Sequence, residues 1–487
     1  MSDRPWRAAA LTLLAALSGC SMAPAYRPPV IAAPLGFKET GPWLPASPAN
    51  IAPPEAWWTL FHDPTLDRLE QQLADANPTL AGAVGRYDAA RAYLARARSD
   101  LLPSVAIATQ LTDNRQSDNR PLRGSGQPDL YAADTISGAI DYELDLWGRV
   151  RNQVAAGRAE AEASADDVAA IKLSLGGELA SDYIGLRGAD QQIALLRNTV
   201  DDYAQADALT QRRFRGGIAS GVDTGRSGAQ LAEARAQLSD VMAGRALIEH
   251  AIASLVGVPA SSFTIASATT GPAMPAIPAG LPSTLLERRP DVAAAERRMM
   301  AANAEIGVAR AAFFPSISLG GQGGFQNTGL AGLASAPNLF WSVGPSAVLS
   351  LFDGGRRRAQ VALARANWDQ ATAAYRGNVL KAFQDVEDSL SQLHLVGDEA
   401  AAEQQAESQA GQVEALSLNR YVKGAVTYLD VVTAQATALR IRRTLIDLTT
   451  RKLQASVRLA RATGGGWRYA APALSAQTAG PERRSHS

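Results

Sequence analysis

Carboxylates recur at every second position in one short stretch of the chain: Asp141, Glu143 and Asp145. Two carboxyl groups with different pKa values could act as a general acid and a general base. The alternation has a simpler explanation, because successive side chains of a β-strand point to opposite faces. Apolar residues occupy the intervening positions, so we interpret the three acids as the face of a half-buried strand that lines an aqueous lumen.

Other residue types that support catalysis do not form a recognisable set. The four histidines are scattered along the chain: His62, His250, His394 and His486. They form no HExxH pattern, and the single cysteine, Cys20, offers no partner for a zinc site. The stretch 320–324 is rich in glycine, but no lysine follows it as in a phosphate-binding loop. The sequence therefore predicts a protein that is not an enzyme and that has no catalytic residues and no metal site.

Charge excludes another class of function. The chain has 47 basic and 47 acidic residues and a formal net charge of +0. Nucleic-acid-binding domains usually carry a basic excess, so no nucleic acid is expected among the partners. Hydrophobic residues make up 46% of the chain and aromatic residues only 6%. This composition favours long, closely packed helices over an aromatic-rich β-sandwich.

The amino terminus has the features of a targeting segment. Arg4 and Arg7 precede the apolar run 8–17, which is too short to cross a bilayer. The tetrapeptide 17–20, Leu-Ser-Gly-Cys, resembles the lipobox of bacterial lipoproteins, where cleavage precedes a cysteine that becomes acylated. A free thiol in an ordinary signal peptide is the alternative. We expect a covalent lipid on Cys20 and no other cofactor, and the serine that follows favours sorting to the outer membrane.

An internal duplication organises the rest of the chain. Matching features occur in the same order in both halves: Pro78 with Pro290, Pro103 with Pro315, Gly148-Arg149 with Gly355-Arg356, Arg213-Phe214 with Arg420-Tyr421, and Gly217 and Asp223 with Gly424 and Asp430. Each half starts with a helical pattern that ends before a proline, continues with strand-like alternation, and then shows a proline-free pattern of about 65 residues. A helix of that length would be roughly 100 Å long. On the helices alone, an ordinary coiled coil is the alternative.

The strand-like regions argue for an assembly of several chains. Each half contains two segments in which apolar and polar residues alternate, on either side of a loop at 113–127 or 327–338. A membrane-spanning strand needs about ten residues, with lipid on one face and a polar lumen on the other. After Cys20 no apolar run is long enough for a transmembrane helix, so we expect any route through a membrane to be a closed β-barrel. Four strands cannot enclose a pore, so other copies must contribute; a four-stranded cap on a soluble helical body is the alternative.

Several motifs in order resemble the TolC-type outer-membrane efflux channels, and their lipoprotein branch in particular. They lie between about Pro54 and Thr463: the entry segment 57–67, then Leu285–Val292, Ala302-Asn303-Ala304-Glu305-Ile306-Gly307, Phe313–Ile317, Leu351–Arg356 and Ala382-Phe383-Gln384-Asp385-Val386-Glu387-Asp388. The resemblance implies a mainly α fold with a β-barrel. A homotrimer would form a twelve-stranded outer-membrane barrel with four strands per chain, continued by a long periplasmic α-helical barrel.

The resemblance also implies residues that close the tunnel at its periplasmic tip. The tip turns would lie at 216–223 and 424–430 and include Gly217, Asp223 and Gly424. In the family, Tyr and Asp residues of the second turn help to close the tunnel, and the matching positions here are Tyr421 and Asp430. Three copies of Asp430 around one axis would form a ring of carboxylates that attracts cations. The alternative role for Asp430 is a helix N-cap, and both roles can hold together. A second acid found three residues later in some members is Thr433 here.

These features together predict the boundaries of the chain's parts. We expect a signal peptide at 1–19, a lipid-anchored extended segment at 20–60, a first repeat at 61–264, a linker at 265–284, a second repeat at 285–463 and a disordered tail at 464–487. Within the repeats we expect helices at 78–101 and 290–312, strands at about 104–146 and 316–352, and long helices at about 149–255 and 355–463.

The implied function is that of a passive duct in the cell outer membrane of a Gram-negative bacterium, lipid-anchored and extending into the periplasm. Its expected partners are outer-membrane lipid, a periplasmic adaptor (membrane fusion) protein and an inner-membrane pump of the RND type. Drugs or other small toxic compounds would be the cargo. Two alternatives remain at this point: a type I protein-secretion duct of the same architecture, and a structural lipoprotein without a pore.

Overall fold

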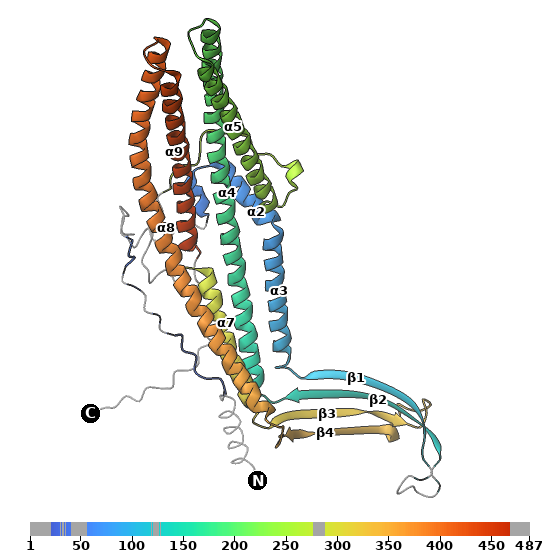
Figure 1. The fold of residues 1–487 in the computed structure, drawn as a ribbon. Helices are drawn as coiled ribbons and strands as arrows, with labels where there is room; N and C mark the ends of the chain where they lie inside the picture. The colour runs from blue at the N-terminus through green and yellow to red at the C-terminus, as the bar shows by residue number, and fades with distance from the viewer. Residues whose placement is uncertain are drawn as a thin grey trace, which may run out of the picture. The chain divides into compact units, whose positions relative to one another are not determined.

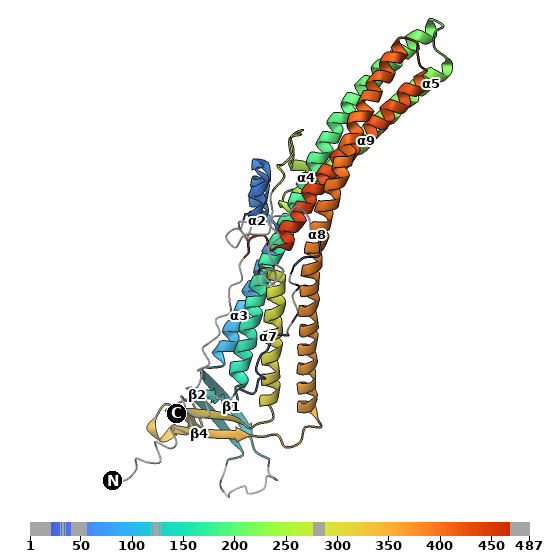
Figure 2. The same ribbon diagram turned by 90° about the vertical axis from the view of Figure 1, so that its left-hand side faces the viewer.

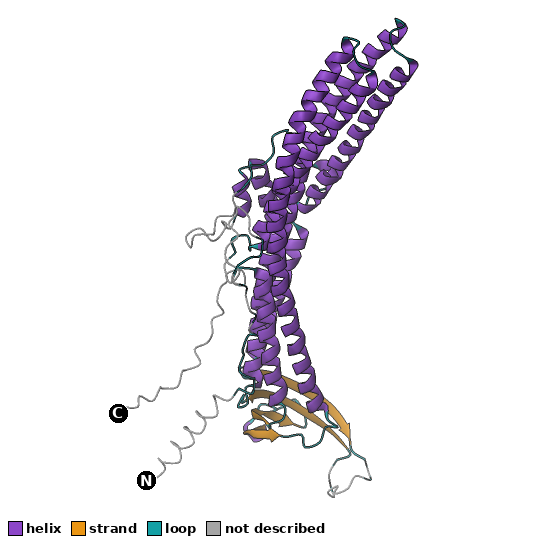
Figure 3. Cartoon of the chain, turned by 60° about the vertical axis from the view of Figure 1, so that its left-hand side comes forward, coloured by secondary structure: helices purple, strands orange, loops and turns teal. Residues whose placement is uncertain are grey.

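A computed structural model describes residues 21–29, 31, 34, 36–39, 56–117, 119, 126, 128–275 and 288–467. Figure 3 shows that helices dominate and that the strands are gathered in one sheet. The predicted fold class, mainly α-helical with four strands per chain, is confirmed. The chain divides into two compact units, each assembled from three stretches of sequence. Unit 1 comprises 1–30, 85–165 and 294–375, and unit 2 comprises 31–84, 166–293 and 376–487.

The sheet belongs to unit 1 and is a simple antiparallel meander in space. Its strands are β1 (Ser104–Arg115), β2 (Leu130–Glu143), β3 (Ser316–Asn327) and β4 (Leu339–Val348), in the order β1-β2-β3-β4 (Figure 1). The second strand of the first repeat thus pairs with the first strand of the second repeat. β2 ends at Glu143, so the predicted continuation of its alternation to residue 146 is wrong.

The register of the sheet separates apolar from polar side chains. Val105 pairs with Ile140, Ile140 with Gly321, and Gly321 with Val343. Because side chains alternate along each strand, this row defines one face. That face carries Val105, Ile107, Leu111, Ile136, Ile140, Tyr142, Leu319, Phe325, Leu339, Trp341 and Val343. The opposite face carries mainly Ser, Thr, Gln, Gly and Ala.

Four helical segments complete unit 1: most of α3 (Pro78–Ser99), most of α7 (Pro290–Ala311) and the first parts of α4 (Arg149–Arg215) and α8 (Arg356–Val422). Alanine is frequent on these helices, and it combines a high helix propensity with a small side chain that allows close packing. Ile306 and Ala309 of α7, for example, pack against Ala364 of α8 in a small buried cluster.

Unit 2 is built around two helix hairpins. α4 pairs with α5 (Gly221–Leu255), and α8 pairs with α9 (Tyr428–Ala462); both turns lie at the same end of the unit (Figure 2). The short helix α2 (Pro64–Ala76) packs on this unit, and its core cluster includes Trp57, Phe61, Tyr183 and Val457. Within the described part of the chain, no helix combines the length and the apolar character that crossing a membrane requires.

The packed part of the chain extends further than we expected, although the last helix ends at Ala462. We placed the start of a disordered tail at residue 464, but Gly464 and Gly465 are buried, and Gly465 lies against Trp57 and Leu173. That prediction is therefore wrong for residues 464–467. A Cβ at residue 465 would overlap the Leu173 side chain and lie 3.0 Å from that of Trp57, so only glycine fits where the chain passes between them. The rest of the predicted tail, the whole predicted signal peptide and residues 276–284 of the predicted linker lie outside the described residues.

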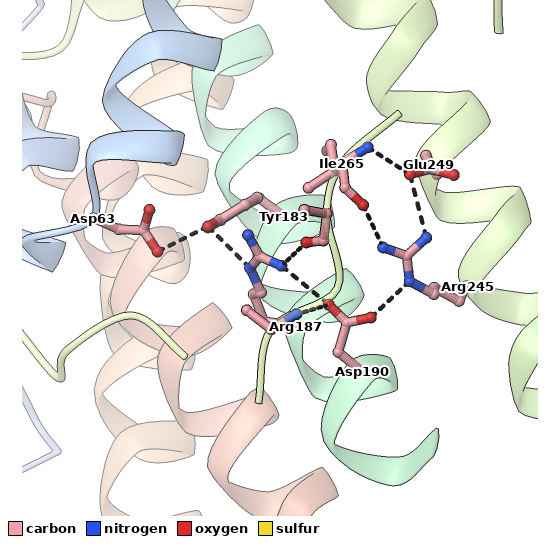
Figure 4. Close-up of polar contacts among 9 residues, drawn as sticks. Asp63, Tyr183, Arg187, Asp190, Arg245, Glu249 and Ile265 are labelled. Atoms are coloured by element: carbon pink, nitrogen blue, oxygen red, sulfur yellow. Dashed lines mark hydrogen bonds and ion pairs between the residues drawn. The ribbon is translucent and has the colours of Figure 1, made fainter. Parts of the chain in front are cut away.

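A buried polar network holds the segment around residue 265 and the start of α2 to the helices of unit 2 (Figure 4). Asp190 is almost fully buried, and it accepts hydrogen bonds from Arg187 at 3.0 Å and from Arg245 at 2.6 Å. The network continues through further bonds: Arg187 to Tyr183, Tyr183 to Asp63, Arg245 to the Ile265 carbonyl, and the Ile265 amide to Glu249. Asp63 in turn caps α2, so one set of charges positions four chain segments.

Glu70 of α2 is a second buried acid, and it lacks such partners. Its carboxyl group lies against Gly176 of α4, where an added Cβ would come within 2.8 Å of Oε2. Oε1 has no hydrogen-bond partner among the described residues. Burial raises the pKa of Glu70 to about 8, while the charge of Lys172 acts in the opposite direction.

Replacing Asp190 by alanine should destabilise unit 2 strongly. Two buried guanidinium groups would lose their shared counter-charge, which costs about 3–5 kcal/mol. We expect a clear fall in the Tm of the purified protein, measured by circular dichroism. The exposed Asp202, on the same helix, is the matched control, and an equal effect of Asp202→Ala would contradict the role of the network.

Glu70 should make stability depend on pH. Because its pKa is near 8 when folded and 4.5 in the unfolded chain, the folded state binds the extra proton, and stability falls as pH rises from about 4.5 to 8. The loss should reach roughly 5 kcal/mol, at about 1.4 kcal/mol per pKa unit. Glu70→Gln should remove this part of the pH dependence of Tm, whereas the exposed Asp240→Asn should leave it in place.

Candidate functional site

The two hairpins of unit 2 end in turns of the same construction. The first turn occupies 216–220 and the second 423–427. Gly217 and Gly424 have φ angles of 72° and 77°, in the left-handed region that favours glycine. The space around both glycines is open, so the backbone conformation, and not close packing, requires glycine at these positions.

Hydrogen bonds show that both helices end in a Schellman motif. In the first turn, the Gly217 amide donates to the Phe214 carbonyl at 2.9 Å and the Ile218 amide to that of Arg213 at 2.8 Å. In the second, the Gly424 amide donates to the Tyr421 carbonyl and the Ala425 amide to that of Arg420, both at 2.9 Å. The internal repeat is therefore preserved at the level of single hydrogen bonds.

The acids of the two turns occupy equivalent capping positions. Asp223 Oδ2 accepts hydrogen bonds from the backbone amide and the hydroxyl of Ser220, at 3.1 and 2.8 Å. Asp430 Oδ2 accepts from the same groups of Thr427, at 3.0 and 2.8 Å. Thr427 is thus the N-cap and Asp430 lies three residues later, which corrects the alternative that made Asp430 itself the cap. The Asp430 side chain is exposed, and its position on the helix leaves Oδ1 available for other contacts.

Tyr421 lies in a compact aromatic cluster beside the second turn. It is buried against Tyr428 and Val431, and the two tyrosine rings meet edge to face at 5.2 Å. Burial raises the pKa of Tyr428 to about 12, so this hydroxyl stays neutral at any physiological pH. The Tyr421 hydroxyl is buried without a hydrogen-bond partner in the described part of the chain.

Arg213, at the end of α4, joins the first hairpin to this cluster. Its guanidinium lies 4.7 Å from the centre of the Tyr421 ring, and Nη1 donates to the Tyr421 carbonyl at 2.8 Å. A cation over an aromatic face adds about 0.5–1 kcal/mol at an exposed site and more when desolvated. We did not single out Arg213 from the sequence as a site residue. The signal was the Arg-aromatic pair that ends both long helices.

A polar groove lies further along the two hairpins in the same unit. Its volume is about 570 Å³, and side chains of α4, α5 and α9 line it, including Tyr203, Gln230, Glu233, Arg440 and Arg443. Gln230 links the two hairpins by donating to Gln435 at 3.2 Å. The groove holds both acids and bases, which suits contact with a polar helical surface more than with an apolar ligand.

The acids of the first repeat are not arranged as we expected. Glu143 pairs with Arg149 at 2.6 Å and Asp145 with Arg151 at 3.2 Å, so two of the three neutralise the first turn of α4. Asp145 also lies beyond the end of β2. Only Asp141 keeps an exposed position on the polar face of the sheet. The interpretation as one acidic lumen row is therefore wrong for Asp145, because the chain leaves the strand to start a helix.

Two other expectations concern cofactors. Cys20 lies outside the described residues, so its lipid stays a prediction. Among the residues that the structure describes, no group of three or more His, Cys, Asp or Glu side chains could hold a metal ion.

The chain combines a sheet that has one apolar face and two unpaired edges with two pairs of long helices. This combination is typical of a class of outer-membrane channel proteins. The model of the outer membrane efflux protein family matches residues 69–258 and 281–465, and the chain belongs to this family. It is an outer-membrane channel for efflux.

Known relatives cover nearly the whole chain. The outer membrane protein OprJ of Pseudomonas aeruginosa is 33% identical over 461 residues, which is 94% of this chain and 95% of the relative. The pyoverdine export outer membrane protein OpmQ of Pseudomonas putida is 31% identical, covering 91% and 94%. Among solved structures, the outer-membrane channel OprN matches with a TM-score of 0.84 at 29% identity, covering 92% of this chain and 100% of that one. The open state of the MtrE channel of Neisseria gonorrhoeae matches with a TM-score of 0.81 at 26% identity, covering 92% and 99%.

The turn glycines give a direct test of the tip geometry. Gly424→Ala should destabilise the second hairpin by about 1–2 kcal/mol, because a Cβ in the left-handed region is strained. Gly225→Ala is the matched control, since this glycine lies within α5 with open space around it, and alanine should stabilise the helix there by about 1 kcal/mol. We expect the two variants to shift Tm in opposite directions. Shifts of the same sign would contradict the requirement for glycine at position 424.

Proposed function

We propose that three copies of the chain share one closed cylinder of twelve strands in the outer membrane. The observation that carries this proposal is the exposed apolar face of the sheet. Ile107, Trp341 and Val343 on that face are 82%, 73% and 68% exposed. At about 25 cal/mol per Å² of apolar surface, leaving such a face in water is unfavourable. Lipid would cover the face without burying many polar side chains.

The edges of the sheet support the same assembly. β1 and β4 are the outer strands, and neither has a partner on its outer side among the described residues. Unpaired edges expose backbone donors and acceptors that cannot be satisfied in a membrane. Pairing β4 of one copy with β1 of the next would satisfy them, and three copies of four strands would close the ring around the polar face.

The long helices would then continue the duct into the periplasm. α4 and α8 have 67 residues each, which corresponds to about 100 Å of helix. We propose that a periplasmic adaptor grips the hairpin turns and that an inner-membrane pump of the RND type supplies the energy. The relatives are named for pyoverdine, toluene and antibiotic export. All three are small-molecule cargoes, and the last two support small toxic compounds as the cargo class without selecting one of them.

The lipid on Cys20 belongs to the same proposal. More than one acyl chain would give a firm anchor, because each buried CH₂ contributes about 0.8 kcal/mol. The lipid would place the amino terminus in the outer membrane together with the strands.

The closed end of the duct would lie at the turns. In a trimer, three copies of the exposed Asp430 would face one axis, and the Arg213–Tyr421 contact would keep the second hairpin against the first. Opening would separate the α8–α9 hairpin from the α4–α5 hairpin and move Tyr421 away from Arg213.

Channel activity is the first test of the proposal. The purified full-length protein should run as a heat-modifiable trimer on gels and should conduct ions in planar bilayers. A monomer that leaves the bilayer silent would support the structural lipoprotein instead. Secretion of a protein substrate that is lost on deletion, with unchanged drug sensitivity, would support the type I secretion duct.

The gate has its own test. Asp430→Ala should raise the conductance and reduce the preference for cations, because the carboxylate ring is lost. Asp223→Ala removes the equivalent capping acid from the other turn, at a similar cost of about 1 kcal/mol, and should leave selectivity unchanged. Unchanged current and cation preference in Asp430→Ala would refute the gate assignment.

A further inference from the structure

The stretch 302–307 of α7 has no role in the sheet or in the hairpin turns described above, yet it contacts the amino-terminal segment of the chain. Residues 21–29, which directly follow Cys20, run along this part of unit 1. Asn303, Gly307 and Arg310 are spaced so that they share one face of the helix. All three contact or face the amino-terminal segment.

Side chains of the helices supply hydrogen-bond partners for the backbone of this segment. Asn303 Nδ2 donates to the Pro24 carbonyl at 2.9 Å, and Arg310 Nη1 donates to the Met22 carbonyl at 3.4 Å. Asn303 is buried. The Ser21 hydroxyl donates to Asn152 Oδ1, on α4, at 2.9 Å. An extended segment outside a sheet needs such partners, because its own backbone groups cannot pair with one another.

Gly307 provides the space in which Ala23 sits. A Cβ on Gly307 would lie 2.8 Å from both the amide nitrogen and the Cβ of Ala23, and 2.5 Å from Asn152 Nδ2. No side chain larger than hydrogen fits while the segment is docked. Glycine is less favourable than alanine within a helix, and the close approach of Ala23 explains why glycine occupies this position.

A second contact of the same kind lies in unit 2, in the stretch 382–388 of α8. The carboxylate of Glu387 accepts two backbone hydrogen bonds, from the Lys38 amide at 2.7 Å and from the Glu39 amide at 3.1 Å. Hydrogen bonds to a charged group are stronger than those between neutral groups, so one side chain holds this later part of the segment.

We propose that these two helix stretches are binding sites for the chain's own amino-terminal segment, and that they determine where the anchored terminus lies. The first site is formed by Asn152, Asn303, Gly307 and Arg310, and the second by Glu387. The anchoring part of this inference rests on the proposed lipid at Cys20. A flexible chain of about 20 residues would let its end wander by roughly 25 Å, so a lipid alone could not fix the segment. Gly307 lies in the last turns of α7, just before β3, so the first site holds the residues after Cys20 close to the sheet.

Hydrogen exchange of the purified full-length protein, followed by mass spectrometry, tests the first site. Gly307→Ala should raise the exchange of peptides covering residues 21–29, because the new Cβ expels Ala23. Gly85→Ala is the matched control, since Gly85 lies in a helix of the same unit with nothing near it. Asn303→Ala should act in the same direction as Gly307→Ala without adding a side-chain clash. Unchanged exchange in both variants would overturn the proposal.

Hydrogen exchange at two single amides tests the second site. Glu387→Ala should raise the exchange rate of the Lys38 and Glu39 amides about tenfold or more, since 1.4 kcal/mol corresponds to a factor of ten. Asp388→Ala, which removes the next carboxylate on the helix, should not. An equal increase in both variants would contradict a specific role of Glu387.

The mass of the amino-terminal peptide separates this inference from the lipid. An acylated Cys20 with exchange that responds to Gly307→Ala supports both proposals. A peptide without lipid would refute the anchor and therefore the positioning role. An acylated peptide with exchange that ignores Gly307→Ala, Asn303→Ala and Glu387→Ala would overturn the binding sites and leave the anchor intact.

Discussion

The structure depends on one constraint: a four-stranded sheet with an apolar face and two open edges cannot be a stable end product in water. Both the apolar side chains and the edge backbone groups need partners that the single chain does not supply among its described residues. Lipid can cover the face, and other copies of the chain can pair the edges. The register strengthens this argument, because it places the large apolar side chains of all four strands on the same face of the sheet. Membership of the outer membrane efflux protein family is consistent with that solution.

The helices meet a different constraint, because long helices must pack closely along their length and must satisfy the backbone groups at their ends. Alanine-rich packing lets the hairpins lie close together. Schellman motifs at the ends of α4 and α8, and capping boxes at the starts of α5 and α9, leave few unsatisfied backbone groups at the turns. The contacts between the two hairpins near the turns include Arg213 with Tyr421 and Gln230 with both Gln435 and Tyr428. Further along unit 2, the buried ion network around Asp190 joins α4 to α5 within the first hairpin. The same network also holds the segments around residues 63 and 265.

The amino-terminal segment contacts helices of both units. Its backbone is held by Asn303 and Arg310 in one unit and by Glu387 in the other. Packing between the helices does not by itself require these residue types at their positions, whereas contact with the amino-terminal segment does. If Cys20 carries the proposed lipid, these side chains on α7 and α8 would fix the position of the anchored terminus.

The sequence by itself determined the elements with strong periodicity. The duplication, the strand alternation and the long proline-free helices predicted a mainly helical chain with four strands, and the glycines predicted both turns, because these signals depend only on local backbone preferences. Tertiary structure decided which charges meet. Glu143 and Asp145 looked like members of one polar row, yet they pair with arginines of the following helix. No local pattern predicted that Arg213 contacts Tyr421, that Asp190 also binds Arg245, or that Glu387 holds residues 38 and 39, because these partners lie far away in the sequence. Local periodicity is written into neighbouring residues, whereas ion pairs and docking contacts exist only once packing has brought distant segments together.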